Sequence, residues 1–233
     1  MNIELSKKDE IIQLRPLGDI HIGNVACDLD KFKANVDFVQ NHDNYYTVGM
    51  GDYIDNIMAY AGGSVDKRWN PETTNRQTLT TEEQTDLFVK LWKPIADRTW
   101  GFIVGNHEWK TINQRRFIKD FCEPLGVKYL GRLALIGVSF TYKGKEVRHY
   151  EMVALHGGYA GIRAGGTINR LEDIVDSFEN IDLGIMGHSH RLWAYPTSKL
   201  GRDRQTNRPY QRKIILANTG TFLTSYHHGT DGY

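Results

Sequence analysis

The sequence feature that most constrains the fold is a repeated arrangement in which a short apolar run ends at a polar side chain able to bind a metal. Five such runs occur, and in four of them the polar residue directly follows a glycine. The runs are residues 11–17, 45–50, 100–104, 151–155 and 181–186. Runs of this length, rich in valine, isoleucine and aromatic residues and bounded by glycine, predict buried strands.

Helical patterns lie between several of these runs. Apolar residues at helical spacing predict helices over residues 30–41, 114–121 and 169–178. Residues 80–84 place a threonine three positions before an acidic or amide side chain. This resembles a capping box that opens a further helix, which ends near Pro94.

Residues 133–156 predict an antiparallel hairpin with its turn at residues 143–145. Strands that alternate with helices, together with a hairpin, predict an α/β fold with mixed sheets. At this length we expect a single domain over residues 1–233.

Composition excludes several classes of protein. The formal net charge is +1, so no overall field draws the chain toward nucleic acid or anionic lipid. The longest apolar stretches, such as residues 133–140, are shorter than the roughly 18 residues of a membrane span, and residues 1–12 lack the apolar core of a signal peptide. Cys27 and Cys122 lie far apart, which argues against a disulfide framework or a thiolate zinc site. We therefore expect a soluble, cytoplasmic protein without membrane contact.

The polar side chains at the strand ends have the composition of a metal site. Ligands of open α/β sheets bind beyond the carboxyl ends of the strands, where these side chains are expected. Each motif alone is weak, because aspartates often cap helices and a single histidine is more often structural. Together they include five of the nine histidines, and oxygen and nitrogen donors without sulfur favour Mn²⁺, Fe or Zn²⁺ over copper. The candidate metal ligands are Asp19, His21, Asp52, Asn106, His156, His188 and His190.

The ordered series of motifs resembles the calcineurin-like metallophosphoesterases. The resemblance spans residues 18–190 and follows the family's order. Its blocks are Asp19-x-His21, Gly51-Asp52-x-x-Asp55, Gly105-Asn106-His107-Glu108, His156 and Gly187-His188-x-His190. The resemblance implies a four-layer sandwich, in which two mixed β-sheets lie face to face with helices outside. It also implies two divalent metal ions at the sheet edge, with Mn²⁺ favoured and Fe or Zn²⁺ as alternatives.

The resemblance further implies a role for each side chain. One metal would be bound by Asp19, His21 and His190. The other would be bound by Asn106, His156 and His188, with Asp52 bridging the two. The implied reaction is hydrolysis of a phosphate ester by a metal-bridging hydroxide, with His107 as general acid. Asp55 beside His107 would orient the imidazole and raise its pKa, the alternative for Asp55 being a helix cap.

The substrate is less constrained than the reaction. Family members that dephosphorylate proteins carry an arginine where this chain has Asn56, so the chain is nearer to the nuclease and phosphodiesterase branches. We expect a small or nucleotide-like phosphodiester or phosphomonoester. The alternative is a DNA or RNA nuclease, and a catalytically idle metal-binding module is the third reading. The intact His107 argues against an idle site.

Three segments are candidates for contact with the substrate. The basic residues of segment 199–213 suit a phosphate backbone, but a solvated hairpin is favoured because only Tyr195 and Tyr210 could stack on bases. The long polar stretch 59–79 is a second candidate wall. Glycines between 157 and 166 predict a loop before a helix, either a phosphate-binding turn or a flexible connector.

Overall fold

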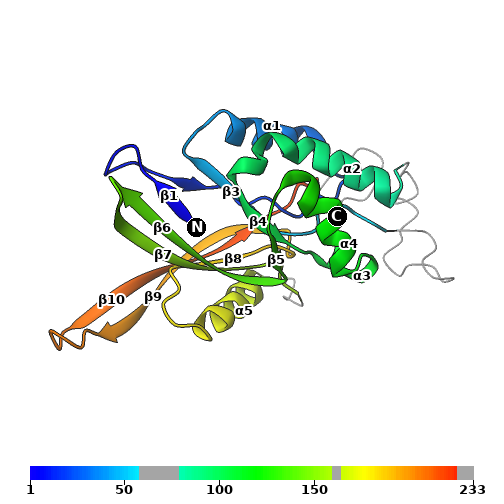
Figure 1. Cartoon of the computed structure of the whole chain (residues 1–233). Helices are drawn as coiled ribbons and strands as arrows, with labels where there is room; N and C mark the ends of the chain where they lie inside the picture. Colours follow the sequence, from blue (N-terminus) through cyan, green and yellow to red (C-terminus); the bar gives the residue numbers. More distant parts are fainter. Residues whose placement is uncertain (58–78, 159–163, 225–233) are drawn as a thin grey trace.

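The computed structural model describes residues 1–57, 79–158 and 164–224, and its strands form two sheets (Figure 1). The first has six strands in the order β1-β6-β7-β8-β10-β9, and the second has four in the order β2-β3-β4-β5. The six-stranded sheet consists of β1 (Asn2–Glu4), β6 (Leu133–Tyr142), β7 (Lys145–Leu155), β8 (Leu183–Met186), β9 (Leu192–Arg202) and β10 (Pro209–Thr219). The four-stranded sheet consists of β2 (Gln13–Leu14), β3 (Tyr45–Gly49), β4 (Thr99–Ile103) and β5 (Tyr129–Gly131).

Helices connect the strands and cover both outer faces. The α-helices are α1 (Leu29–Gln40), α2 (Thr81–Trp92), α3 (Asn106–Thr111), α4 (Gln114–Phe117) and α5 (Ala164–Asp176). A π-helix follows α4, and two short 3₁₀ helices follow α2 and the π-helix. Figure 1 shows α1 and α2 on one side of the two sheets and α5 on the other.

Three apolar cores separate four layers. The core between the helices and the four-stranded sheet includes Phe32 of α1, Trp92 of α2 and Phe102 of β4. The core between the two sheets includes Val48, Ile103, Ile136 and Ala154. The core beneath α5 includes Val153, Leu171, Val175 and Leu216. This order of helix, sheet, sheet and helix confirms the predicted four-layer sandwich.

The two sheets differ in strand direction. In the six-stranded sheet β6–β7 and β9–β10 are antiparallel pairs, whereas β7–β8 and β8–β10 are parallel. The four-stranded sheet is parallel in the three pairings described. Only the six-stranded sheet is mixed, because both hairpins belong to it. The expectation that both sheets are mixed therefore holds for one of them, and the other is parallel in the pairings described.

Local sequence signals explain several helix boundaries. Helix α1 buries Phe32, Val36 and Val39, as their helical spacing predicted. At the start of α2 the Thr80 hydroxyl accepts from Glu83 N, and the Glu83 carboxylate accepts from Thr80 N, so the predicted capping box is present.

The glycine-rich segment differs from its prediction. Helix α5 already includes Gly165 and Gly166, so these residues do not form a loop. The first turn of a helix tolerates exposed glycines, and burial of Leu171 and Val175 against the six-stranded sheet stabilises the helix. Residues 159–163 lie outside the described residues.

The predicted hairpin over residues 133–156 is confirmed as the pair β6–β7. Its two turn residues, Lys143 and Gly144, have φ values of 52° and 71°. Positive φ at both central positions is typical of the type I′ turn, whose backbone twist matches the right-handed twist of the two strands that it joins.

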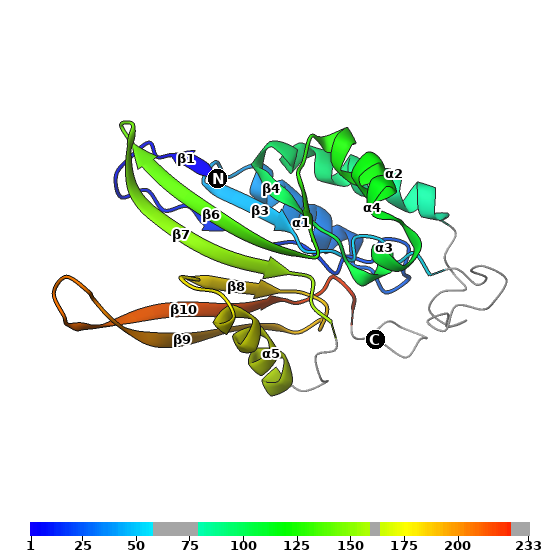
Figure 2. The ribbon, with the colours of Figure 1, turned by 60° about the horizontal axis from the view of Figure 1, so that its bottom comes forward.

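Backbone hydrogen bonds join the exits of neighbouring strands. Beyond β2, the N–H groups of Asp19 and Ile20 donate to the carbonyls of Gly51 and Asp52 beyond β3, both at 2.9 Å. The exits of β7 and β8 are joined by the bond from Gly187 N to His156 O at 3.1 Å. Parallel strands bring their carboxyl ends to one edge, and Figure 2 shows β7 and β8 running side by side toward it.

Candidate metal centre

The predicted ligands all lie at strand exits. Asp19 follows β2 and Asp52 follows β3, while Asn106 is the first residue of α3 after β4. His156 directly follows β7, and His188 follows β8. The sheet edge therefore brings together residues that are far apart in the sequence.

Most of these residues have an unusual backbone conformation. Five of the seven candidate ligands have φ between 49° and 67°, in the left-handed region that residues other than glycine rarely adopt. The five are Asp19, His21, Asp52, His188 and His190. Such conformations cost free energy and cluster at functional sites, where the surrounding structure holds them.

Glycines at the exits allow the side chains to approach one another. A Cβ on Gly187 would lie 2.6 Å from Asp19 Oδ2, and a Cβ on Gly105 would overlap the backbone nitrogen and the carboxylate of Asp52. Any larger residue at either position would displace a candidate ligand.

The first donor group consists of Asp19, His21 and His190, whose ligand atoms lie within 4.8 Å of one another. His190 Nε2 lies 3.3 Å from Asp19 Oδ1 and 3.2 Å from His21 Nε2. Asp19 and His21 are buried. Two imidazole nitrogens that face each other beside a carboxylate form a donor set that a divalent cation fits.

The second donor group consists of Asp52, His156 and His188, again with ligand atoms within 4.8 Å. His156 Nε2 lies 3.1 Å from Asp52 Oδ2 and 3.0 Å from Asn106 Oδ1. His156 Nδ1 lies 2.7 Å from the carbonyl oxygen of Met50. If Nδ1 carries the proton and donates to that carbonyl, Nε2 is left free to bind a metal.

Asp52 lies between the two groups. Its Oδ2 is 4.0 Å from His21 Nε2 and 3.1 Å from His156 Nε2. Burial favours the neutral carboxyl, but the neighbouring imidazoles, His156 first, hold the pKa of Asp52 well below its ordinary value. Against the effect of burial, the charge of Asp52 raises the pKa of His156 to about 10. The centre therefore keeps an ionised carboxylate at the position predicted for a bridge.

His107 and Asp55 lie beside His21 and Asp52 but contact each other differently from the prediction. His107 Nδ1 is 2.5 Å from the backbone carbonyl of Asp55 and 3.8 Å from its carboxylate. Asp55 Oδ1 is closer to His21 Nδ1, at 3.4 Å. Burial lowers the pKa of His107 to about 4, outweighing the charges of Asp52 and Asp55. Asp55 therefore acts in the predicted direction and raises the pKa, but burial sets the net shift.

His107 also has the geometry of a third donor group. With His21 and Asp52 it places ligand atoms within 4.8 Å of one another. Its Nε2 lies 3.9 Å from Asp52 Oδ2. Two roles are therefore geometrically available to His107, as an acid beside the centre or as a ligand within it, and metal binding by a variant separates them.

Glu108 has a role that the sequence analysis did not assign. Its fully buried carboxylate accepts four backbone N–H groups. Oε1 accepts from Tyr53 at 2.7 Å and Ile54 at 3.1 Å, and Oε2 accepts from Asp52 and Gly105, both at 3.1 Å. Glu108 thus joins the loop that carries Asp52 to the turn that carries Asn106 and His107. Its place in the Gly-Asn-His-Glu block was the only sequence signal.

Three asparagines support the same loops. Asn24 Nδ2 donates to Asp55 Oδ1 at 3.2 Å, and Asn218 Nδ2 donates to Gly187 O at 3.1 Å. Asn56, which replaces the arginine of the protein phosphatases, is buried and donates to the carbonyl of His107 at 3.1 Å. Its side chain is therefore used structurally, and no spacing in the sequence indicated this.

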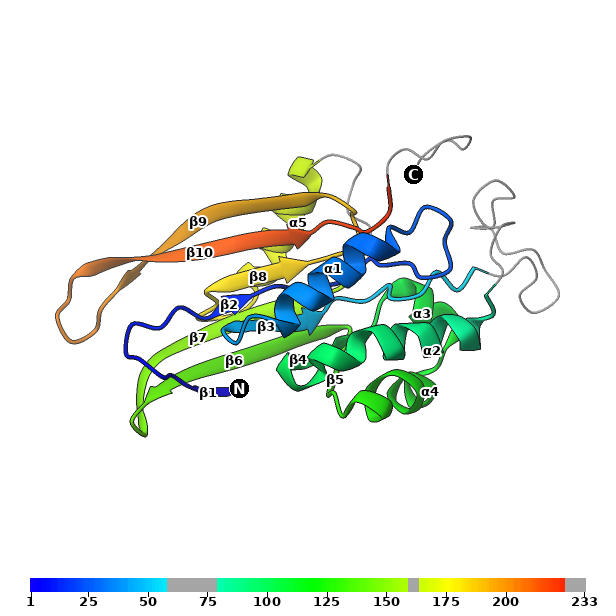
Figure 3. The same cartoon turned by 90° about the horizontal axis from the view of Figure 1, so that it is seen from above.

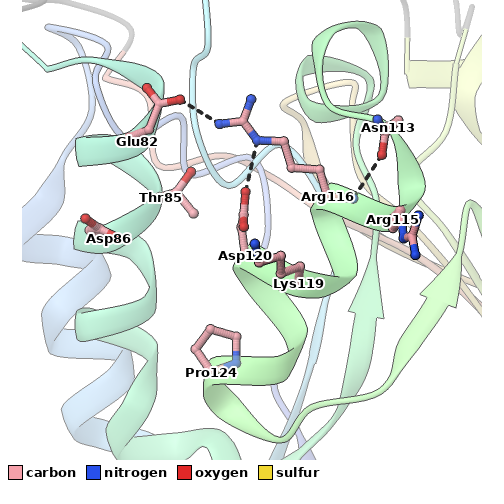
Figure 4. A pocket seen from close by; sticks show the side chains of 9 residues that line it. All are labelled: Glu82, Thr85, Asp86, Asn113, Arg115, Arg116, Lys119, Asp120 and Pro124. Atoms are coloured by element: carbon pink, nitrogen blue, oxygen red, sulfur yellow. Dashed lines mark hydrogen bonds and ion pairs between the residues drawn. The ribbon is translucent and has the colours of Figure 1, made fainter.

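Other predicted contacts lie elsewhere. The basic segment 199–213 covers the end of the β9–β10 hairpin, whose tip is far from the strand exits (Figure 1). Of the polar stretch 59–79, all but the last residue lies outside the described residues. A hollow between α2 and α4 contains Arg116, which pairs with Glu82 at 2.6 Å and Asp120 at 3.0 Å (Figure 4). None of the candidate ligands lines that hollow.

Two sheets with this layer order and a buried cluster of imidazoles and carboxylates at their edge are the fold and the donor set of a metal-binding α/β protein. The family model for calcineurin-like phosphoesterases matches residues 17–231. The chain belongs to this family, whose members are metal-dependent phosphoesterases.

Solved structures of low sequence identity also match. A conserved protein of Streptococcus pneumoniae TIGR4, described as a predicted phosphoesterase, has 11% identity and a TM-score of 0.37, with 94% of this chain and 76% of that chain covered. The nuclease MPE of Pseudomonas putida has 13% identity and a TM-score of 0.36, with 94% and 75% covered. No match to a curated protein was found. None of the helices in the described residues is long and apolar enough to span a membrane.

Proposed function

We propose that the chain hydrolyses a phosphate ester of a small or nucleotide-like substrate, with two divalent cations at the strand exits. The observation that carries the proposal is the position of Asp52, whose buried carboxylate lies between the two donor groups. One group would hold a cation through Asp19, His21 and His190. The other would hold a cation through Asn106, His156 and His188, with Asp52 shared.

When bound, two such cations neutralise phosphate oxygens and lower the pKa of a water molecule that attacks the phosphorus. The donor set of carboxylate, amide and imidazole without sulfur favours Mn²⁺, with Fe or Zn²⁺ as alternatives. The remaining tasks belong to the side chains around the centre.

His107 is proposed to protonate the leaving oxygen. Its Nδ1 is held by the carbonyl of Asp55, so Nε2 is the atom that remains to hold and donate a proton. Its low pKa in the free protein results mainly from burial, and the negative charge of a bound phosphate ester would raise that pKa. Proton donation matters most when the leaving group is a poor one.

Asn56 supports a substrate other than a phosphoprotein. Its side chain donates to the carbonyl of His107 and does not supply the forked guanidinium that clamps a phosphate. The proposal therefore favours a phosphodiester, or a phosphomonoester of a small molecule, over a phosphorylated protein.

The test is hydrolysis of p-nitrophenyl phosphate, bis-p-nitrophenyl phosphate and single-stranded DNA, each with Mn²⁺ or with EDTA. We expect Mn²⁺-dependent turnover of the small diester, the monoester or both. Cleavage of DNA alone would favour the nuclease alternative. No turnover of any substrate by a protein that binds two equivalents of Mn²⁺ would support the idle-module reading and contradict the proposal.

A further inference from the structure

A groove of about 780 Å³ runs along the side of the molecule, between β2 and the β9–β10 hairpin. Residues 13–17 and Lys31 of α1 line one wall, and residues 192–194 and 217–223 line the other. Figure 3 shows α1 and β2 lying beside β10 on this side. Pockets that bind nucleotide-sized ligands have volumes of roughly 300–1,000 Å³, so the groove has room for part of a substrate.

The groove reaches the metal centre. His190, a member of the first donor group, lines it. The segment that forms part of its wall also contacts Asp19 of the same group. Thr221 Oγ1 donates to Asp19 O at 2.9 Å, and Phe222 N donates to the same carbonyl at 3.0 Å. One ligand could therefore occupy the groove and also place a phosphate group at the metal centre.

The charges in the groove favour an anion. Among the residues that the structure describes, no Asp or Glu lines it, whereas Arg15 and Lys31 do. Neither cation forms an ion pair with a described residue. Arg15 instead lies 4.2 Å above the Phe38 ring, and Lys31 lies 5.9 Å from the Phe222 ring. The hollow in Figure 4 differs, because three carboxylates line it together with its basic residues.

Aromatic side chains accompany the two cations. Tyr45, Trp193 and Phe222 line the same groove. Cations that contact a backbone, next to rings on which bases stack, are the combination with which proteins bind single-stranded nucleic acid. A groove with this lining, which includes His190 and runs from residues 13–17 to residues 217–223, therefore suits a nucleic acid strand.

We propose that this groove binds the nucleotides that flank the scissile phosphodiester of a short single-stranded oligonucleotide. The inference rests on the proposed two-cation hydrolysis at the same centre, and for its substrate it selects the nuclease alternative, acting on a short single strand. Arg15 and Lys31 contact phosphates of the flanking strand, and the aromatic side chains contact its bases. The contacts are few, so the affinity depends only moderately on salt.

Binding is tested without turnover, by fluorescence anisotropy of a labelled ten-residue oligothymidylate in EDTA. We expect the single variant Lys31→Gln and the double variant Arg15→Gln/Lys31→Gln to raise Kd by roughly two- to fivefold for each phosphate contact that is lost. The slope of log Kobs against log salt should fall in magnitude by about 0.7 for each contact. Lys33→Gln is the matched control, because Lys33 lies on the same helix, pairs with Asp30 at 3.1 Å and does not line the groove.

A second pair of variants places a negative charge inside or outside the groove. Leu192 and Leu200 are 83% and 81% exposed and share one face of β9, but only Leu192 lines the groove. Leu192→Glu should weaken oligonucleotide binding, whereas Leu200→Glu should leave it unchanged. Because both side chains are exposed, neither substitution is expected to disturb folding.

Three outcomes would contradict oligonucleotide binding in the groove. The first is an unchanged Kd and salt slope in Lys31→Gln and Leu192→Glu, and the second is an equal effect of the control substitutions Lys33→Gln or Leu200→Glu. The third is competition by thymidine monophosphate that is as strong as competition by the unlabelled oligonucleotide. Hydrolysis of bis-p-nitrophenyl phosphate with Mn²⁺ is measured in parallel. Its absence in the wild-type protein would contradict the proposed function, while the EDTA binding data would still report on the groove.

Discussion

At the scale of single residues, Asp52 Oδ2 is the atom on which the centre converges. Imidazole nitrogens of His156, His107 and His21 lie 3.1, 3.9 and 4.0 Å from it. Its partner oxygen, Oδ1, accepts the backbone N–H of His107 at 2.8 Å. One carboxylate is thus held by the turn after β4 while it faces both donor groups.

Asp52→Asn should weaken the binding of both metals, because an amide replaces the charge that the two sites share. Loss of hydrogen bonds to metal ligands alone lowers metal affinity about 10–100-fold, so loss of a ligand charge should cost at least about tenfold. Equilibrium dialysis with Mn²⁺ and metal analysis measures this. Asp30→Asn, at an exposed side chain, is the control. Two equivalents bound with wild-type affinity would refute the bridging assignment.

His107→Ala should retain two equivalents of metal and lose roughly 10²–10⁴-fold in rate, the range of general acid catalysis. The loss should be smaller for diesters of p-nitrophenol than for diesters of alcohols, since p-nitrophenolate needs little protonation. His149→Ala, at an exposed histidine, is the control. If the variant instead binds one equivalent, His107 is a ligand, as its contact with His21 and Asp52 also allows.

At the scale of secondary-structure elements, Glu108 in the first turn of α3 joins two strand exits. Each of its carboxylate oxygens accepts two backbone N–H groups, from residues 52–54 beyond β3 and from Gly105 beyond β4. An acceptor with four donors and no exposed surface cannot be replaced by water. Together with the direct bond from His107 N to Asp52 Oδ1, this side chain therefore fixes the relative position of Asp52 and His107.

Glu108→Gln should destabilise the metal-free protein. Whichever carboxylate oxygen becomes the amide nitrogen, two buried N–H groups lose their acceptor, at a cost of about 1–3 kcal/mol each. Urea unfolding should show a decrease of at least about 2 kcal/mol, and metal affinity should fall with it. Glu123→Gln, at an exposed position, should change neither. An unchanged unfolding midpoint would mean that the loops are held by other contacts.

Much of the fold could be predicted because its signals are local. The capping box of α2, the apolar spacing of α1 and the turn at Lys143 and Gly144 each depend on a few neighbouring residues. The early start of α5 was missed because burial of Leu171 and Val175 outweighs the low helix propensity of the glycines before them.

The centre was predictable in its residues but not in its contacts. Motif order named the side chains that the strand exits bring together, including those whose φ is positive. The burial that lowers the pKa of His107, the carbonyl of Asp55 that holds its Nδ1, and the clamp at Glu108 all depend on packing between distant segments. Contacts between distant segments produce no recognisable spacing of residues in the sequence.

At the scale of the whole molecule, the basic hairpin and the metal centre lie at different ends. β9 starts two residues after His190, and at about 3.4 Å per residue Arg202 lies about 34 Å along the strand from its first residue. Two of the basic residues are already paired, Lys199 with Asp176 at 2.7 Å and Arg212 with Asp182 at 2.9 Å. The exposed basic residues that remain near the turn are Arg202, Arg204 and Arg208, with Asp203 between them.

Replacing these three arginines with glutamine should therefore leave hydrolysis of a small diester unchanged, and should raise Kd for a ten-residue oligonucleotide less than twofold. A strand of that length bound at His190 and along the groove lies on the β2 side of the molecule and does not follow β9 to its tip. The measurements are bis-p-nitrophenyl phosphate turnover with Mn²⁺ and oligonucleotide anisotropy in EDTA, each over a salt series. Lys31→Gln is the positive control for a weakened phosphate contact. A steep salt dependence in the wild-type protein that the triple substitution abolishes would show that nucleic acid binds along the hairpin. That result would contradict the groove as the binding site of the strand.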